Sequence, residues 1–83
     1  MTAVRKIVAR NLKMLRKARG ISQDELAAVA GIDRSYISDT ENEKYGISID
    51  KLESLAGALG IAPWEMLHPL TATNDRKTAP GKD

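Results

Sequence analysis

This chain of 83 residues contains no cysteine and no phenylalanine, and it has one histidine and one tryptophan. Without cysteine it can form neither a disulfide bond nor a cysteine-based metal site, and His68 has no second histidine with which to share a metal ion. No apolar run approaches the roughly 20 residues that a membrane-spanning helix needs. We therefore expect a soluble cytoplasmic protein without a metal, a cofactor or a membrane contact.

The patterns of common enzyme sites are also missing. No Ser/His/Asp set has a spacing that suggests a catalytic triad, and no Gly-rich loop is present that could hold a phosphate. Trp64 lacks the aromatic neighbours that a base-stacking platform requires, so we expect it in the core or at a subunit contact. We interpret the chain as a protein that is not an enzyme.

The length allows one small domain, and the last stretch differs from it in composition. A single core of this size leaves little stability to spare unless the helices pack well or the chain oligomerises. Residues 71–83, TATNDRKTAPGKD, have no apolar period and are rich in small, polar and charged residues. We predict one domain over residues 1–70 and a disordered tail over residues 71–83.

Apolar residues at helical spacing predict a first helix from about residue 3 to Arg19, which Gly20 ends. Its expected core stripe is Val4, Ile7, Val8, Leu12 and Leu15. Ser22 and Glu25 then have the spacing of a capping box, which predicts a second helix that starts at Gln23. Gly31 can end this helix in the left-handed conformation. Its expected apolar side is Leu26, Ala27, Val29 and Ala30.

A third helix follows after a very short turn. We expect Ile32 to pack back onto the core and Asp33 to cap a helix over Arg34–Glu41. Because the two helices are joined by so few residues, they must cross sharply, and small Ala27 permits their close approach. This pattern predicts a helix-turn-helix.

Two more helices complete the predicted all-α domain. Asn42 is expected to take the left-handed cap position, and Gly46 to provide a bend in the loop that follows. Ser48 can cap a fourth helix that ends at Gly60, with Ile49, Leu52, Leu55, Ala56 and Leu59 on its apolar face. Pro63 suits the first turn of a short fifth helix, whose Trp64, Met66 and Leu67 either close the core or face a partner.

The stretch GISQDELAAVAGIDRSYISDTE resembles the Cro/C1-type helix-turn-helix family, the Xre-like regulators of bacteria and phages. The similarity lies in the S-Q-x-E-L-A start, the A-G-I turn and the pair Ile37 and Glu41, and it covers roughly residues 4–68. It implies a compact five-helix domain of the lambda-repressor-like type. It also implies an ion pair between Arg16 and Glu41 that joins the first and third helices. The family usually has Gly at the position of Glu43, which this chain lacks.

The resemblance implies that the third helix enters the major groove of double-stranded DNA, which is wide enough for one α-helix. Its expected base-reading residues are Arg34, Ser35, Ser38 and Asp39. Arg34 is the first candidate because a guanidinium can bind guanine through two hydrogen bonds. Expected contacts to the DNA backbone are made by Gln23, Tyr36, Asn42 and Lys44. For Tyr36, packing of the ring against the second helix is an equal alternative.

The charge distribution bears on this interpretation. Residues 1–20 carry seven basic residues and no acidic one, whereas residues 21–70 carry nine acidic residues and three basic ones. A basic helix is often only a solvated face, but beside a helix-turn-helix it can face phosphates. The acidic residues Asp39 and Glu43 near the third helix oppose DNA binding, unless Asp39 accepts a hydrogen bond from cytosine.

The sequence thus predicts a transcriptional regulator that binds a two-fold symmetric operator as a homodimer, through Trp64, Met66 and Leu70 near the C-terminus, and that occludes or recruits RNA polymerase. Two alternatives lie within the family: a restriction-modification controller, which the run DRSYIS resembles, and the antitoxin of a toxin pair. A third alternative is a helical protein-interaction module without DNA binding. Salt dependence separates it from the others, because DNA affinity falls steeply as salt rises.

Overall fold

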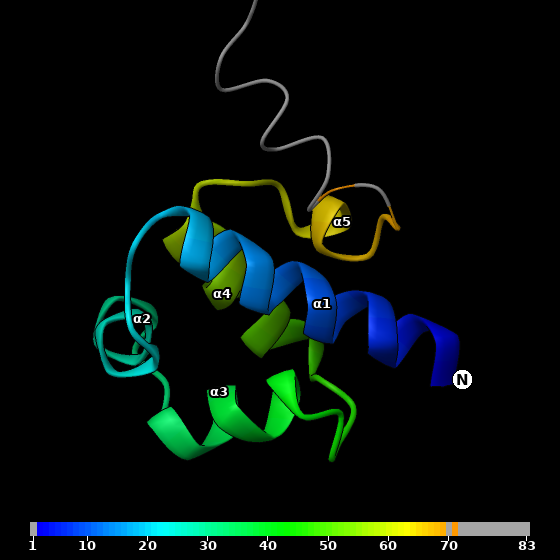
Figure 1. Cartoon of the computed structure of the whole chain (residues 1–83), viewed down its shortest axis with the longest axis horizontal. Coiled ribbons are helices and arrows are strands. Elements are labelled where there is room, and N and C mark those ends of the chain that lie inside the picture. Colours follow the sequence, from blue (N-terminus) through cyan, green and yellow to red (C-terminus); the bar gives the residue numbers. More distant parts are fainter. Residues whose placement is uncertain (1, 70, 72–83) are drawn as a thin grey trace, which may run out of the picture.

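A computed structural model of the chain describes residues 2–69 and residue 71. Within this part the chain forms five helices and no strand, which confirms the predicted all-α fold. The helices are α1 (Thr2–Ala18), α2 (Gln23–Ala30), α3 (Arg34–Glu41), α4 (Ile49–Leu59) and α5 (Pro63–Met66). Figure 1 shows α1 in front of α4, with α2 and α3 at one side of it and α5 at the other. The predicted tail lies outside the described residues except for Thr71.

The ends of the helices follow from residues close in sequence. The Ser22 hydroxyl accepts a hydrogen bond from the backbone N–H of Glu25 at 3.0 Å, and the Glu25 carboxylate accepts one from the backbone N–H of Ser22 at 2.7 Å. This is the predicted capping box. Gly31 then ends α2 with a φ of 69°, in the left-handed conformation. Asp33 occupies the cap position of α3, but its side chain makes no capping hydrogen bond, contrary to our expectation.

One hydrophobic core joins all five helices. Its fully buried members include Leu12 and Leu15 of α1, Leu26 of α2, Ile37 of α3 and Leu55 of α4. Met66 of α5 is equally buried and belongs to the same core. The short turn after Gly31 brings Ile32 into this core, as predicted.

Four residues of the predicted apolar faces lie outside the core, and one of them, Ile7 on α1, is half-buried. Val4 on α1, Val29 on α2 and Ile49 on α4 are exposed. Each of these three lies three or four positions from a buried residue, namely Val8, Leu26 and Leu52, but periodicity does not say how wide a stripe the partner helices cover. The prediction that they belong to the core was wrong.

A buried polar residue, Asn11 on α1, holds the end of α5. Its side chain is fully buried, and its amide nitrogen donates hydrogen bonds to the carbonyl oxygens of Met66 at 2.8 Å and His68 at 2.9 Å. Carbonyl groups at the end of a helix have no partner within the helix, so a side chain that satisfies them from a neighbouring helix stabilises the junction. The sequence pattern gave no indication of this role.

The loop between α3 and α4 contains a strained residue. Glu43 has a φ of 61°, while Asn42, the expected left-handed residue, has a φ of −95°. Asn42 instead donates a side-chain hydrogen bond to the carbonyl oxygen of Ser38 at 2.9 Å. The loop therefore keeps the left-handed geometry at the position where the family has Gly, although the residue here is Glu.

We expect Glu43→Gly to raise the free energy of unfolding by about 1 kcal/mol, because a Cβ in the left-handed conformation costs about 1–2 kcal/mol and Gly avoids this cost. Urea unfolding followed by circular dichroism measures the gain. Glu43→Ala is the matched control: it removes the same charge but keeps the Cβ, so it should give no comparable gain. Equal stabilisation by both substitutions would assign the effect to charge instead of backbone strain.

Candidate nucleic-acid interface

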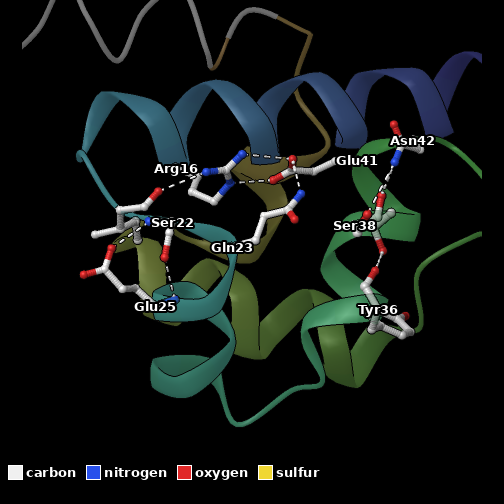
Figure 2. A network of polar contacts seen from close by, with 10 residues as sticks. Arg16, Ser22, Gln23, Glu25, Tyr36, Ser38, Glu41 and Asn42 are labelled. Atoms are coloured by element: carbon white, nitrogen blue, oxygen red, sulfur yellow. Dashed lines mark hydrogen bonds and ion pairs between the residues drawn. The ribbon is translucent and has the colours of Figure 1, made fainter.

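Helix α3 is held in place by a polar network that joins α1, α2 and α3 (Figure 2). Arg16 donates hydrogen bonds from Nε to one carboxylate oxygen of Glu41 at 2.7 Å and from Nη2 to the other at 3.1 Å. Its Nη1 donates to the carbonyl oxygen of Ile21 at 3.0 Å. Gln23 completes the network, because its Nε2 donates to Glu41 at 3.1 Å. The ion pair expected between Arg16 and Glu41 is thus present, with both oxygens of the carboxylate engaged.

This ion pair lies inside the protein. The exposed fractions of the Arg16 and Glu41 side chains are 10% and 3%. The hydrogen bonds to Glu41 raise the pKa of Arg16 above its ordinary value, against the lowering effect of burial. Its location excludes direct contact with a base, so the pair serves to fix the end of α3 against α1.

The four candidate base-reading residues lie along α3 on its solvent side. Arg34 and Ser35 are exposed, and Ser38 and Asp39 are half-buried. Arg34 approaches Asp24 of α2, with 3.3 Å between Nε and Oδ1. Asp39 approaches Lys44 of the following loop, with 3.8 Å between Oδ1 and Nζ. The acidic charge of Asp39 is therefore partly offset by a nearby lysine.

The candidate backbone-binding residues have different surroundings. The Tyr36 side chain contacts the start of α4: its hydroxyl accepts a hydrogen bond from the backbone N–H of Ser48 at 3.1 Å, and Lys51 Nζ lies 5.7 Å from the ring centre. Asn42 and Lys44 are exposed just after α3. The side chain of Gln23 is turned towards Glu41. The backbone N–H of Gln23 lies at the start of α2.

Sequence reasoning missed Asp24, the acidic neighbour of Arg34. It lies in the first turn of α2, and the two residues come together only because the turn at Gly31 folds α3 back past α2. The described residues contain no group of three or more His, Cys, Asp or Glu side chains that could hold a metal ion. In the same part of the chain, each helix is too short or too polar to span a membrane.

Comparison with known proteins places the chain in a family. The helix-turn-helix family model matches residues 12–63. A hypothetical transcription factor of Neisseria meningitidis is 38% identical over 66 residues, which are 80% of this chain and 62% of that protein. The immunity repressor protein of Bacillus phage phi105 is 44% identical over 54 residues, 65% of this chain and 38% of the repressor. The chain thus spans less than two thirds of the length of these two relatives.

A solved structure extends the similarity to three dimensions. The restriction-modification controller protein C.AhdI of Aeromonas hydrophila superposes with a TM-score of 0.73 at 38% identity. The superposition covers 77% of this chain and 97% of the controller protein. Because the family model covers residues 12–63 and the relatives agree with it, this chain belongs to the Cro/C1-type helix-turn-helix family of transcriptional regulators.

Proposed function

We propose that the chain is a sequence-specific DNA-binding regulator that inserts α3 into the major groove of its operator, as a homodimer on a two-fold symmetric site. The observation that carries the proposal is the position of α3. Glu41 ties its end to α1, the turn at Gly31 packs it across α2, and its polar side is left in solvent. A major groove about 12 Å wide admits a helix presented in this way.

The exposed side of α3 has the chemistry for reading bases. Arg34 can form two hydrogen bonds with the O6 and N7 atoms of guanine, and Ser35 and Ser38 can donate to or accept from several base edges. Asp39 can accept from cytosine N4. Arg34 and Asp39 are exposed or half-buried in their ion pairs, so each can exchange its partner for a base at little cost.

Contacts with phosphates would fix α3 in the groove. The capping box uses the N–H of Ser22 and Glu25, and no acceptor in the described part of the chain takes the N–H groups of Gln23 and Asp24. Free N–H groups at the positive end of a helix bind phosphate oxygens. Asn42 and Lys44 would supply phosphate contacts at the other end of α3. Tyr36 would hold the loop between α3 and α4 in position through its hydrogen bond with the backbone N–H of Ser48.

Selection of binding sites from random duplex DNA tests this proposal. We expect the wild-type chain to enrich a two-fold symmetric site, and Arg34→Ala to relax the preference at one base pair in each half-site by about 1–3 kcal/mol. Lys17→Ala is the control, because it removes one exposed positive charge from α1 and should at most weaken binding to all sequences equally. Unchanged base preference in Arg34→Ala would contradict the assigned reading role.

The acidic residues favour one second candidate, a protein-interaction module. Glu43 lies at the end of α3, and the structure shows no ion pair for it among the described residues. If the chain enriches no sequence even at low salt, this second function replaces the first. A steep fall in affinity with rising salt supports DNA binding, because bound phosphates release counterions.

The proposal also covers the regulator's context. The similarity to C.AhdI supports a controller of restriction-modification genes over the antitoxin alternative. A DNA-bound dimer would act in the cytoplasm, where it occludes or recruits RNA polymerase.

A further inference from the structure

Arg34, the first candidate for base reading, has an acidic neighbour on another helix. Asp24 lies in the first turn of α2, and its Oδ1 is 3.3 Å from the Nε atom of Arg34. The two residues belong to different helices, so the turn at Gly31 and not helical spacing brings them together (Figure 1). Among the described residues, no other acidic side chain forms an ion pair with Arg34.

The contact with Asp24 engages one edge of the guanidinium. Arginine has N–H donors on Nε and on both Nη nitrogens, and they point outward as a rigid fork. Asp24 approaches Nε, which leaves the Nη nitrogens facing other partners. Guanine presents its O6 and N7 acceptors to such a fork in the major groove. Arg34 can therefore bind guanine through its Nη nitrogens while Nε stays beside Asp24.

A phosphate group competes with guanine for the same donors. The planar guanidinium matches phosphate oxygens with two parallel hydrogen bonds, and this pairing is strengthened by the opposite charges. Contacts to phosphates position a protein on DNA but carry no sequence information. The base preference of Arg34 thus depends on what keeps its side chain away from the phosphates.

We infer that Asp24 has this role: it is a positioning residue that directs Arg34 to guanine and away from phosphate. The role rests on the proposed function, since it requires α3 in the major groove. The Asp24 carboxylate repels a phosphate that approaches the same guanidinium, whereas the O6 and N7 edge of guanine carries no net charge. Contact at Nε also restricts a flexible side chain before DNA arrives, so less conformational entropy is lost when the base is bound.

The pair is not needed to hold the helices together. Both side chains are largely exposed, and exposed pairs contribute little to stability. The start of α2 is capped by Ser22 and Glu25, so it does not depend on Asp24. A substitution of Asp24 can therefore change recognition while the domain stays folded.

Asp33 offers a matched control for the charge of Asp24. It is exposed and directly precedes Arg34, and it makes neither a capping hydrogen bond nor an ion pair with a described residue. Asp33→Asn removes the same charge near the start of α3, and Asn is also a favoured residue at a helix cap. An effect of Asp24→Asn that Asp33→Asn lacks belongs to the contact with Arg34.

Both members of the pair belong to one chain, so the role of Asp24 does not require a particular dimer contact. The expectation that Met66 contributes to that contact was wrong, because Met66 is fully buried in the core. Trp64 is exposed, which excludes it from the core, and Leu70 lies outside the described residues.

Fluorescence anisotropy at one fixed salt concentration tests the role of Asp24. The probes are the selected operator, duplexes changed at the base pair where Arg34→Ala relaxes the preference, and a scrambled duplex of the same length. We expect Asp24→Asn to lower the penalty for a wrong base by about threefold to fivefold, the range that an exposed ion pair allows. Asp24→Glu keeps the charge and should keep most of the penalty. Asp33→Asn should change the affinity for all duplexes alike.

The salt dependence on the scrambled duplex gives a second readout. Arg34 released from Asp24 gains a phosphate contact there, so the slope of log affinity against log salt should steepen by about 0.9 per subunit in Asp24→Asn. Asp33→Asn should leave this slope unchanged. In a chain that already carries Arg34→Ala, Asp24→Asn should alter neither the base penalty nor the slope.

Two results would overturn the role of Asp24: equal changes in Asp24→Asn and Asp33→Asn, or an effect of Asp24→Asn that persists without Arg34. The proposed function fails in a different way. A wild-type chain that selects no sequence contradicts DNA reading and the role of Asp24 together. A selected operator whose base penalty is unchanged in Asp24→Asn contradicts the role of Asp24 alone.

Discussion

Glu41→Ala should lower the free energy of unfolding by about 3–5 kcal/mol, which is the usual effect of removing one partner of a buried ion pair. The substitution leaves the Arg16 guanidinium with one hydrogen bond, to the carbonyl oxygen of Ile21, in a site where its side chain is 10% exposed. It also removes the acceptor of Gln23. Since small domains are stable by about 5–15 kcal/mol, we expect the variant to be close to unfolding at room temperature. Urea titration measures the loss.

Arg34→Ala is the control for this prediction. It breaks the pair with Asp24, whose side chains are 62% and 78% exposed, and an exposed pair contributes about 0–1 kcal/mol. A similar loss in both variants would show that burial does not distinguish the two pairs.

The pH dependence of the Arg16 contribution can be stated with its sign. A group whose pKa is higher in the folded than in the unfolded state stabilises the fold below its unfolded pKa, and this contribution disappears as the pH rises through the folded pKa. The pKa of Arg16 is raised by its hydrogen bonds to Glu41, so this loss begins only in strong alkali. Arg16 should therefore contribute equally at all pH values near neutral.

Asn11→Leu should lower the free energy of unfolding by about 2–4 kcal/mol, although it keeps the number and branching of the side-chain heavy atoms. The substitution leaves the carbonyl oxygens of Met66 and His68 without the amide that now donates to both, and each unsatisfied buried group costs about 1–3 kcal/mol. The measurement is again urea unfolding. The effect should be concentrated at α5, which a rise in amide hydrogen exchange of residues 64–68 would show.

Asn11→Ala separates hydrogen bonding from packing. It removes the same hydrogen bonds and leaves a cavity in addition, so it should be less stable than Asn11→Leu. If Asn11→Leu proves as stable as the wild type, then the apolar contacts of the leucine compensate for the lost hydrogen bonds, and Asn11 is not needed to hold α5.

The candidate site could be predicted in part from the sequence. The positions of Arg34, Ser35, Ser38 and Asp39 on α3 came from the family resemblance, and their access to solvent agrees with it. Their pairing with Asp24 and Lys44 could not be predicted, because it depends on the angle at which α3 passes α2 and on the path of the loop. Whether they read bases stays a prediction until DNA binding is measured.

The sequence by itself determined the positions of the helices. The residues that start and end α2 and α4, such as Ser22, Gly31 and Ser48, act on backbone groups within about four positions along the chain, so their effect needs no knowledge of the fold. The third helix spans the predicted residues, and the turn at Gly31 fixes its start in a related way.

The tertiary structure alone decided which side of each helix is covered. Apolar periodicity could not distinguish buried Leu52 from exposed Ile49, nor show that Asn11 would lie in the core, because burial depends on where the neighbouring helices pack. The tertiary structure also decided the backbone conformation at Glu43. The ends of this loop are fixed by α3 and α4, so Glu43 adopts the left-handed conformation although it is not glycine. Local chemistry thus sets the elements, and long-range packing sets the surfaces that they present to a partner.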